Sequence, residues 1–183
     1  ALQMNRKDIF DRIWKWARTY MYLDKGPNAG FFCWSNQLDG RKNADGPAPD
    51  GEEYFAMALF FAAERWGNGE GIFNYTEEAR AILRTAIHGP SKMWDEKYHH
   101  IRFVCNCPFT DPSYHLPHFY EIFAQRADPE DKEFWEEAAK ASRKYLVKAC
   151  HPVTGLAAEY ATDEGNTLPP EHHGTFFSDS YRV

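Results

Sequence analysis

Helical segments of two kinds alternate along the chain, and this alternation constrains the fold more than any other feature. Three segments carry apolar residues at helical spacing with charges between them, as half-exposed helices do: residues 4–22, 76–88 and 130–149. The segments between and after them have the pattern of enclosed helices: residues 51–66, a segment that begins near 111 and a segment that begins near 178. Helices joined by hairpins run antiparallel, so the enclosed helices should place their N-termini at one end. The pattern predicts an all-α fold with two layers.

Local residue preferences predict where several helices begin. Thr76 is a suitable N-cap for the third helix, and Asp111 with Pro112 suits the start of the fourth. Pro117 should bend that fourth helix from inside, and Ser178 is the expected cap of the sixth.

Both ends of the sequence lie within helical patterns. The segment ALQMNRKDIFDRIW enters a helix without a capping residue, and SDSYRV stops in the first turn of a buried one. A natural domain rarely leaves apolar helix starts uncovered. We therefore expect residues 1–183 to be a single partial domain, truncated at both ends and about half of a closed helical ring.

The composition limits the classes of partner. The formal net charge of −6 and the pI near 5.7 argue against nucleic acid, whose partners usually carry a basic stripe. No run approaches ~18 consecutive apolar residues, so a membrane-spanning helix is not expected. Aromatic residues reach 16%, which suits either a groove that stacks sugar rings or an aromatic core.

Metal and disulfide chemistry have little support in the sequence. Cys105 and Cys107 form a lone C-x-C without the paired spacing of a zinc site, so we expect the four cysteines to be buried free thiols. The histidine pairs His99–His100 and His172–His173 lack an accompanying carboxylate–histidine helix pair. No metal and no cofactor are therefore predicted.

Acidic residues stand at the predicted N-termini of the enclosed helices. Asp50, before Gly-Glu-Glu, is either an N-cap or a functional carboxylate. Asp179 follows Ser178, and a Ser178 cap would leave the Asp179 carboxylate free for other work. We expect Glu52 and Glu53 to be solvated first-turn charges, although one of them could reach a sugar hydroxyl.

Three segments, in the right order, resemble glycoside hydrolase family 8. APDGEEYFAMALFFAAERW resembles the family signature, in which Ala, Ser or Thr, Asp, Gly or Ala, and Asp precede an apolar helix; here Pro49 and Glu52 replace two of these residues. DPSYHLPHFYEIFA resembles the family's Pro-Ser-Tyr segment, and SDSYRV its Asp-x-x-Arg segment. The departures, together with CHPVTGLAAEYA, most resemble the branch of reducing-end xylose-releasing exo-oligoxylanases.

The resemblance implies a fold, a reaction and roles for residues. The fold would be an (α/α)6 barrel, a two-layer helical toroid with a sugar cleft at the inner N-termini. The reaction would be inverting hydrolysis of β-1,4-xylooligosaccharides, with xylose released from the reducing end. Asp179 would be the general base, Tyr114 would help to hold the water, and Asp50 would bind and distort the sugar. Arg182 would orient a carboxylate or hydroxyl, and Trp34 would stack on the sugar.

The sequence contains no candidate for the family's general acid. It is a Glu in a Ser/Thr-Glu-Gly-x-x-Tyr-Gly segment before the first helix, and residues 1–183 contain no such segment. We therefore expect negligible hydrolysis by this chain alone. The alternatives are an endo-acting member that cleaves xylan, β-glucan or chitosan, a non-catalytic helical carbohydrate-binding domain, and another α/α-barrel enzyme. The sequence does not specify the cellular compartment, and only the exo-oligoxylanase interpretation favours the cytoplasm.

Overall fold

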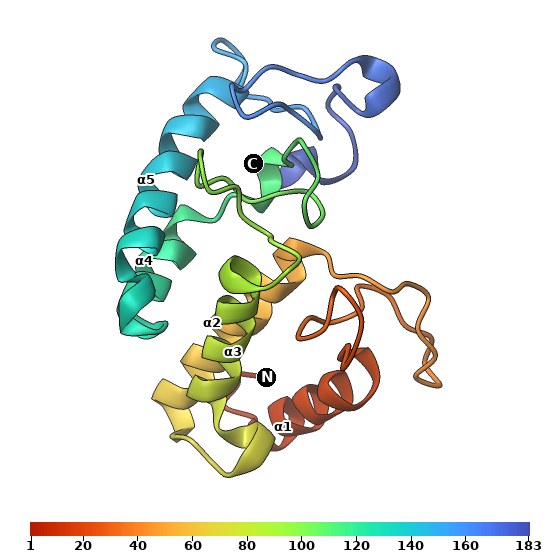
Figure 1. The fold of residues 1–183 in the computed structure, drawn as a ribbon, viewed down its shortest axis with the longest axis vertical. Coiled ribbons are helices and arrows are strands. Elements are labelled where there is room, and N and C mark those ends of the chain that lie inside the picture. Colours follow the sequence, from red (N-terminus) through yellow and green to blue (C-terminus); the bar gives the residue numbers. More distant parts are fainter. The chain divides into compact units, whose positions relative to one another are not determined.

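The computed structural model describes all residues from 1 to 183, and these divide into two compact units. Unit 1 comprises Ala1–Ser91 and Arg126–Asp128, and unit 2 comprises Lys92–Gln125 and Pro129–Val183. Helices, short 3-10 segments and loops with isolated β-bridges make up both units, and no strand is present. The prediction of an all-α chain is confirmed (Figure 1).

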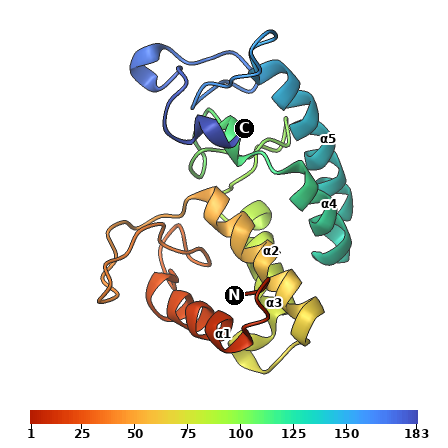
Figure 2. The same ribbon diagram turned by 180° about the vertical axis from the view of Figure 1, so that it is seen from behind.

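Three helices form unit 1: α1 (Lys7–Trp16), α2 (Pro49–Trp66) and α3 (Tyr75–His88). A π-helical turn, Ala17–Met21, extends α1, and α2 and α3 lie side by side in Figures 1 and 2. Trp14 anchors α1, because its buried ring contacts Phe32 and Phe55 and its Nε1 donates to the carbonyl of Ile72 at 2.6 Å. Burial of α2 is less complete than its sequence predicts, since Tyr54 and Phe61 are about half exposed.

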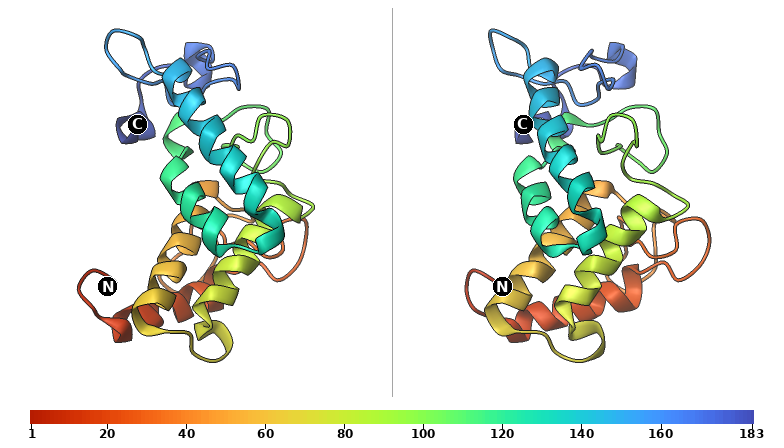
Figure 3. Two further views of the ribbon diagram at one scale, coloured as in Figure 1. Left: turned by 90° about the vertical axis from the view of Figure 1, so that its left-hand side faces the viewer. Right: turned by 60° about the vertical axis from the view of Figure 1, so that its left-hand side comes forward.

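Two helices dominate unit 2: α4 (Pro117–Arg126, whose last residue falls in unit 1) and α5 (Lys132–Ala149). They lie side by side in both views of Figure 3. Trp135 of α5 is fully buried and meets Tyr120 and Phe123 of α4 and Trp94 of the preceding loop. This aromatic cluster is part of the core of unit 2, so some of the aromatic content serves packing.

The fourth predicted helix is split in two. Pro112–Tyr114 is a separate 3-10 turn, and α4 begins only at Pro117. Proline disfavours the α conformation in the residue that precedes it. The helix is therefore interrupted at Leu116, directly before Pro117. Pro117 therefore occupies the first turn of α4, and the prediction that it bends a longer helix from inside is wrong. Asp111 does cap the short turn, because its side chain accepts a hydrogen bond from the Ser113 N–H.

Two predicted caps are wrong. Asn74, not Thr76, caps α3, with its side chain accepting from the Glu77 N–H at 3.3 Å. The chain ends in a 3-10 segment, Ser178–Arg182, in which Ser178 has a positive φ of 41° and makes no capping bond. There the Ser180 hydroxyl accepts from the Phe177 N–H at 3.2 Å. In both places the capping side chain lies elsewhere in the turn than local preference suggests.

The structure also bears on the cysteines and on membrane-spanning helices. All four cysteines are free thiols as predicted, but only Cys33 is buried. None of the helices is both long and apolar enough to cross a bilayer.

Candidate active site

Two short 3-10 segments of unit 2 bring three of the predicted site residues together. Pro112–Tyr114 and Ser178–Arg182 pack against each other. Asp179 and Arg182 are three residues apart and form an ion pair, with Nη2 of Arg182 2.5 Å from Oδ2 of Asp179. The same guanidinium lies 5.6 Å from the ring centroid of Tyr114. Arg182 thus links the candidate base to the candidate water-holding tyrosine.

Asp179 keeps access to solvent. Its side chain is 40% exposed, against 26% for Arg182, so water reaches the carboxylate while the guanidinium fixes one of its oxygens. A short charge-assisted bond of this kind holds a carboxylate in a defined orientation. The arrangement suits a group that must accept a proton from water.

Asp111, beside this pair, is buried to 1% exposure. Its Oδ1 accepts the Ser113 N–H at 2.7 Å, whereas Oδ2 is buried without a hydrogen-bond partner. Burial raises the pKa of Asp111 to about 7; Ser113 and the charge of Arg182 oppose this shift, and the charge of Asp179 adds to it. The sequence assigned Asp111 only as a cap, and nothing local predicted its burial.

Tyr114 is held through its backbone as well as its ring. Its N–H donates to the Asp111 carbonyl at 3.0 Å, and its own carbonyl accepts from the Tyr120 hydroxyl at 3.3 Å. The ring is almost fully buried and stands 5.8 Å from that of Phe103. The position of this side chain therefore depends on the turn that carries it.

Asp50 stands in the first turn of α2 and is not its N-cap. The cap position is Ala48, which makes no side-chain bond, and Pro49 opens the helix. The Asp50 Oδ1 accepts from the N–H of the next residue, Gly51, at 2.9 Å. The capping interpretation is thus wrong, and the functional interpretation of Asp50 stays a prediction, as does its approach to Asp179.

Glu52 and Glu53 are buried, which overturns the prediction of solvated first-turn charges. The Glu52 Oε1 accepts the Phe32 N–H at 2.7 Å. Burial raises the pKa of Glu52 well above its usual value, against the effect of that hydrogen bond. Trp34 follows two residues after Phe32 and is 64% exposed. Glu52 therefore supports the loop that presents Trp34, and direct contact of Glu52 with sugar stays a prediction.

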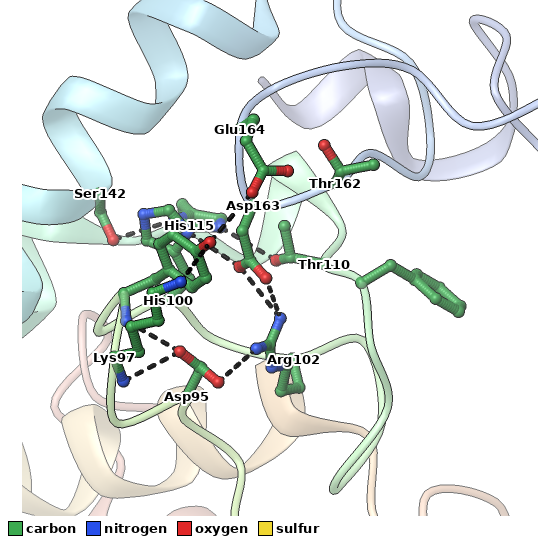
Figure 4. A network of polar contacts seen from close by, with 12 residues as sticks. Asp95, Lys97, His100, Arg102, Thr110, His115, Ser142, Thr162, Asp163 and Glu164 are labelled. Atoms are coloured by element: carbon green, nitrogen blue, oxygen red, sulfur yellow. Dashed lines mark hydrogen bonds and ion pairs between the residues drawn. The ribbon is translucent and has the colours of Figure 1, made fainter.

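A buried polar network in unit 2 was not predicted from the sequence (Figure 4). Arg102 donates twice to Asp163, at 2.8 and 3.0 Å, and contacts Asp95 at 2.6 Å. The His100 Nδ1 lies 3.1 Å from the same Asp163. The His99–His100 pair was the only local signal, and the partners of His100 stand too far along the chain to be inferred.

A second part of this network surrounds His115 (Figure 4). Its Nε2 lies 3.0 Å from the Thr110 hydroxyl and its Nδ1 lies 2.9 Å from the Ser142 hydroxyl. Burial, with help from His100 and Arg102, lowers the pKa of His115 well below its usual value. The ring is therefore neutral near pH 7.

An open pocket of unit 2 does not contain the predicted site residues. It measures about 550 Å³ and has a mixed charged lining that includes Lys92, Asp95, Lys97 and Arg102. No group of three or more His, Cys, Asp or Glu side chains is arranged to hold a metal ion. The chemistry suggested by Asp179, Arg182 and Tyr114 therefore does not coincide with this pocket.

The family model for glycosyl hydrolases family 8 matches residues 1–182. The chain belongs to this family. It is 58% identical to the reducing-end xylose-releasing exo-oligoxylanase of Halalkalibacterium halodurans over 100% of its own residues and 49% of that protein. It is 50% identical to the reducing-end xylose-releasing exo-oligoxylanase of Paenibacillus barcinonensis over 100% of its own residues and 50% of that protein.

Solved structures agree with this membership. The crystal structure of a mutant reducing-end-xylose releasing exo-oligoxylanase complexed with xylobiose matches with a TM-score of 0.96 and 57% identity. The alignment covers 100% of this chain and 50% of the chain in that structure. The chain thus spans about half the length of the relatives it matches. These relatives are (α/α)6 barrel proteins, in line with the expected fold class.

Proposed function

We propose that the protein containing residues 1–183 is an inverting glycoside hydrolase that releases xylose from the reducing end of β-1,4-xylooligosaccharides. The names of relatives that are 50–58% identical over this whole chain support the substrate. The observation that carries the mechanism is the Asp179–Arg182 ion pair beside Tyr114. We also propose that these residues form one partial catalytic domain.

Asp179 acts as the general base in this proposal. Arg182 holds the Asp179 Oδ2, and Oδ1 takes a proton from a water molecule that Tyr114 helps to hold. The water oxygen attacks the anomeric carbon as the bond to the leaving sugar breaks. In inverting enzymes the acid and base carboxyls lie roughly 6.5–9.5 Å apart, which leaves room for this water.

The general acid comes from another part of the protein. Residues 1–183 contain no segment like the family's acid motif, so this chain supplies the base but not the group that protonates the glycosidic oxygen. In the complete reaction the leaving oxygen gains the proton of the acid, and Asp179 gains the proton of water. We therefore expect the isolated chain to be inactive.

Unit 1 supplies sugar-binding groups. The exposed indole of Trp34 offers a flat face for stacking on a xylose ring, and Asp50 offers carboxylate oxygens to sugar hydroxyls. Buried Glu52 supports the loop that carries Trp34 through its hydrogen bond from the Phe32 N–H, and we further propose that Glu52 contacts the sugar itself.

The base assignment is tested by Asp179→Asn in the full-length enzyme with xylotriose as substrate. Turnover should fall about 10²–10⁴-fold, while xylotriose binding measured by calorimetry stays within a few-fold. Asp8→Asn is the matched control, because Asp8 is also paired with an arginine, Arg6, at 2.8 Å on an exposed surface. Unchanged turnover in Asp179→Asn would refute the assignment and would leave a non-catalytic sugar-binding role.

Product analysis tests the reaction class separately. An exo-acting inverting enzyme gives free xylose from the first turnovers, and proton NMR should show the α-anomer at the newly formed reducing end, because water attacks the face opposite the β-linkage. Mixed oligomers at early times would identify an endo-acting enzyme, and a β-anomer would exclude inversion.

A further inference from the structure

The segment that carries Asp111 and Tyr114 is closed by a hydrogen bond between the two residues that flank it. Thr110 precedes the segment and His115 follows it, and the Thr110 Oγ1 lies 3.0 Å from the His115 Nε2. Both flanking residues are nearly fully buried. The bond spans the four residues between them, so it restricts the positions that the turn can adopt.

Each end of this closed segment is fixed to a different element. Thr110 exchanges both backbone hydrogen bonds with Ala161, at 3.1 and 3.0 Å. The His115 Nδ1 lies 2.9 Å from the hydroxyl of Ser142 on α5 (Figure 4). The His115 ring stacks on Tyr145, about one helical turn after Ser142, with 4.3 Å between the ring centroids. The turn is therefore anchored to α5 at one end and to the loop around Ala161 at the other.

Each ring nitrogen of buried His115 needs a hydrogen-bond partner. A neutral imidazole donates from one nitrogen and accepts at the other, and a hydroxyl can serve as partner to either. Both nitrogens of His115 are thus satisfied with no charge in the core. Removal of one hydroxyl would leave a buried ring nitrogen unpaired, so the ring and the turn attached to it would shift.

We propose that His115, held between Thr110 and Ser142, is a positioning residue that sets the place of Tyr114 relative to Asp179. It touches neither the sugar nor the reacting water and acts only through the backbone of the turn. A small displacement of a group that holds a reacting water lowers the rate of the chemical step more than it lowers substrate binding. The proposal rests on the proposed function of Tyr114 and Asp179.

The test uses Thr110→Val and Thr110→Ser in the full-length enzyme with xylotriose. Valine keeps the shape and loses the hydroxyl, whereas serine keeps the hydroxyl. Thr110→Val should lower kcat about 10-fold with KM within about twofold, and Thr110→Ser should stay within about twofold of wild type. Thr85→Val is the matched control, because it removes a hydroxyl that bonds only the Ala81 carbonyl on α3; its kcat should not change.

A purely structural role predicts a different result. If Thr110→Val lowers the unfolding midpoint but keeps kcat, or if the valine and serine variants lose kcat equally, the positioning proposal is overturned. Should Thr110→Val fail to fold, Ser142→Ala tests the other ring nitrogen, and an unchanged kcat there overturns it as well. Tyr114→Phe and Asp179→Asn separate the two proposals. Retained turnover in Tyr114→Phe refutes the water-holding role of Tyr114, and retained turnover in Asp179→Asn refutes the base assignment of the proposed function. Loss of turnover in both variants with an unchanged kcat in Thr110→Val refutes only the positioning role of His115.

Discussion

Substitution of Asp111 by asparagine should change how stability depends on pH. Asparagine keeps an oxygen acceptor for the Ser113 N–H and cannot ionise, so it mimics the protonated acid. In the folded chain burial raises the pKa of Asp111 from 3.8 to about 7. In the unfolded chain the same carboxyl is solvated and has its ordinary value.

The sign follows from which state holds the proton. Between about pH 4 and pH 7 the folded protein binds a proton at Asp111 that the unfolded protein has lost, so wild-type stability falls as pH rises through this window. From pH 5 to pH 8 the folded carboxyl passes from protonated to ionised over roughly two units. At 1.36 kcal/mol per unit this is about 2–3 kcal/mol of unfolding free energy, which the asparagine variant does not lose.

Guanidinium unfolding of the wild type and Asp111→Asn at pH 5 and pH 8 measures this difference. The stability advantage of asparagine should grow by about 2–3 kcal/mol between the two pH values. Asp8→Asn is the control, because Arg6 lowers the pKa of Asp8 to about 2, below the range tested, and its effect should not vary with pH. An Asp111→Asn difference that is equal at both pH values would refute the assignment of a buried, protonated Asp111.

Three further substitutions test the packing around the site, each by denaturant unfolding of the full-length protein. Glu52→Gln should equal or exceed wild-type stability at pH 8, because burial raises the pKa of Glu52 and glutamine still accepts from Phe32; a large loss would contradict this. Arg102→Met should cost about 3–5 kcal/mol, because Asp163 keeps a buried charge without its partner, and a neutral result would refute that pairing. Trp135→Ala should cost about 3–5 kcal/mol as a core cavity, and a cost under 1 kcal/mol would show a collapsible site.

The amphipathic helices could be predicted closely from the sequence because their signal is local. The expected segments 76–88 and 130–149 correspond to Tyr75–His88 and Lys132–Ala149. Apolar spacing specifies such helices without knowledge of their neighbours. Around residue 112 the local signals conflict, since Pro112 and Pro117 both favour a helix start, and the chain uses each for a separate segment.

The site was less predictable because its environment is built from distant residues. Family resemblance selected Asp179, Tyr114 and Arg182, and local pattern alone did not rank them above ordinary caps. Buried Glu52 accepts a hydrogen bond from Phe32, 20 residues away, and buried His115 bonds Ser142, 27 residues away. A pattern of neighbouring residue types contains no information on such pairings, so the preference of acidic residues for the first helical turn was the wrong guide for a glutamate that the fold encloses.

The contrast between Asp111 and Asp179 explains how one arginine can serve the site. Asp179 is partly exposed and forms the ion pair with Arg182, which suits the proposed base, because a base accepts a proton in its ionised form. Asp111 lies close enough to respond to both charges, yet burial favours its neutral form up to about pH 7. If both carboxyls were ionised, they would compete for the same guanidinium and repel each other. Burial of Asp111 therefore leaves the charge of Arg182 to orient Asp179, so a buried acid beside the proposed base helps to hold that base in place.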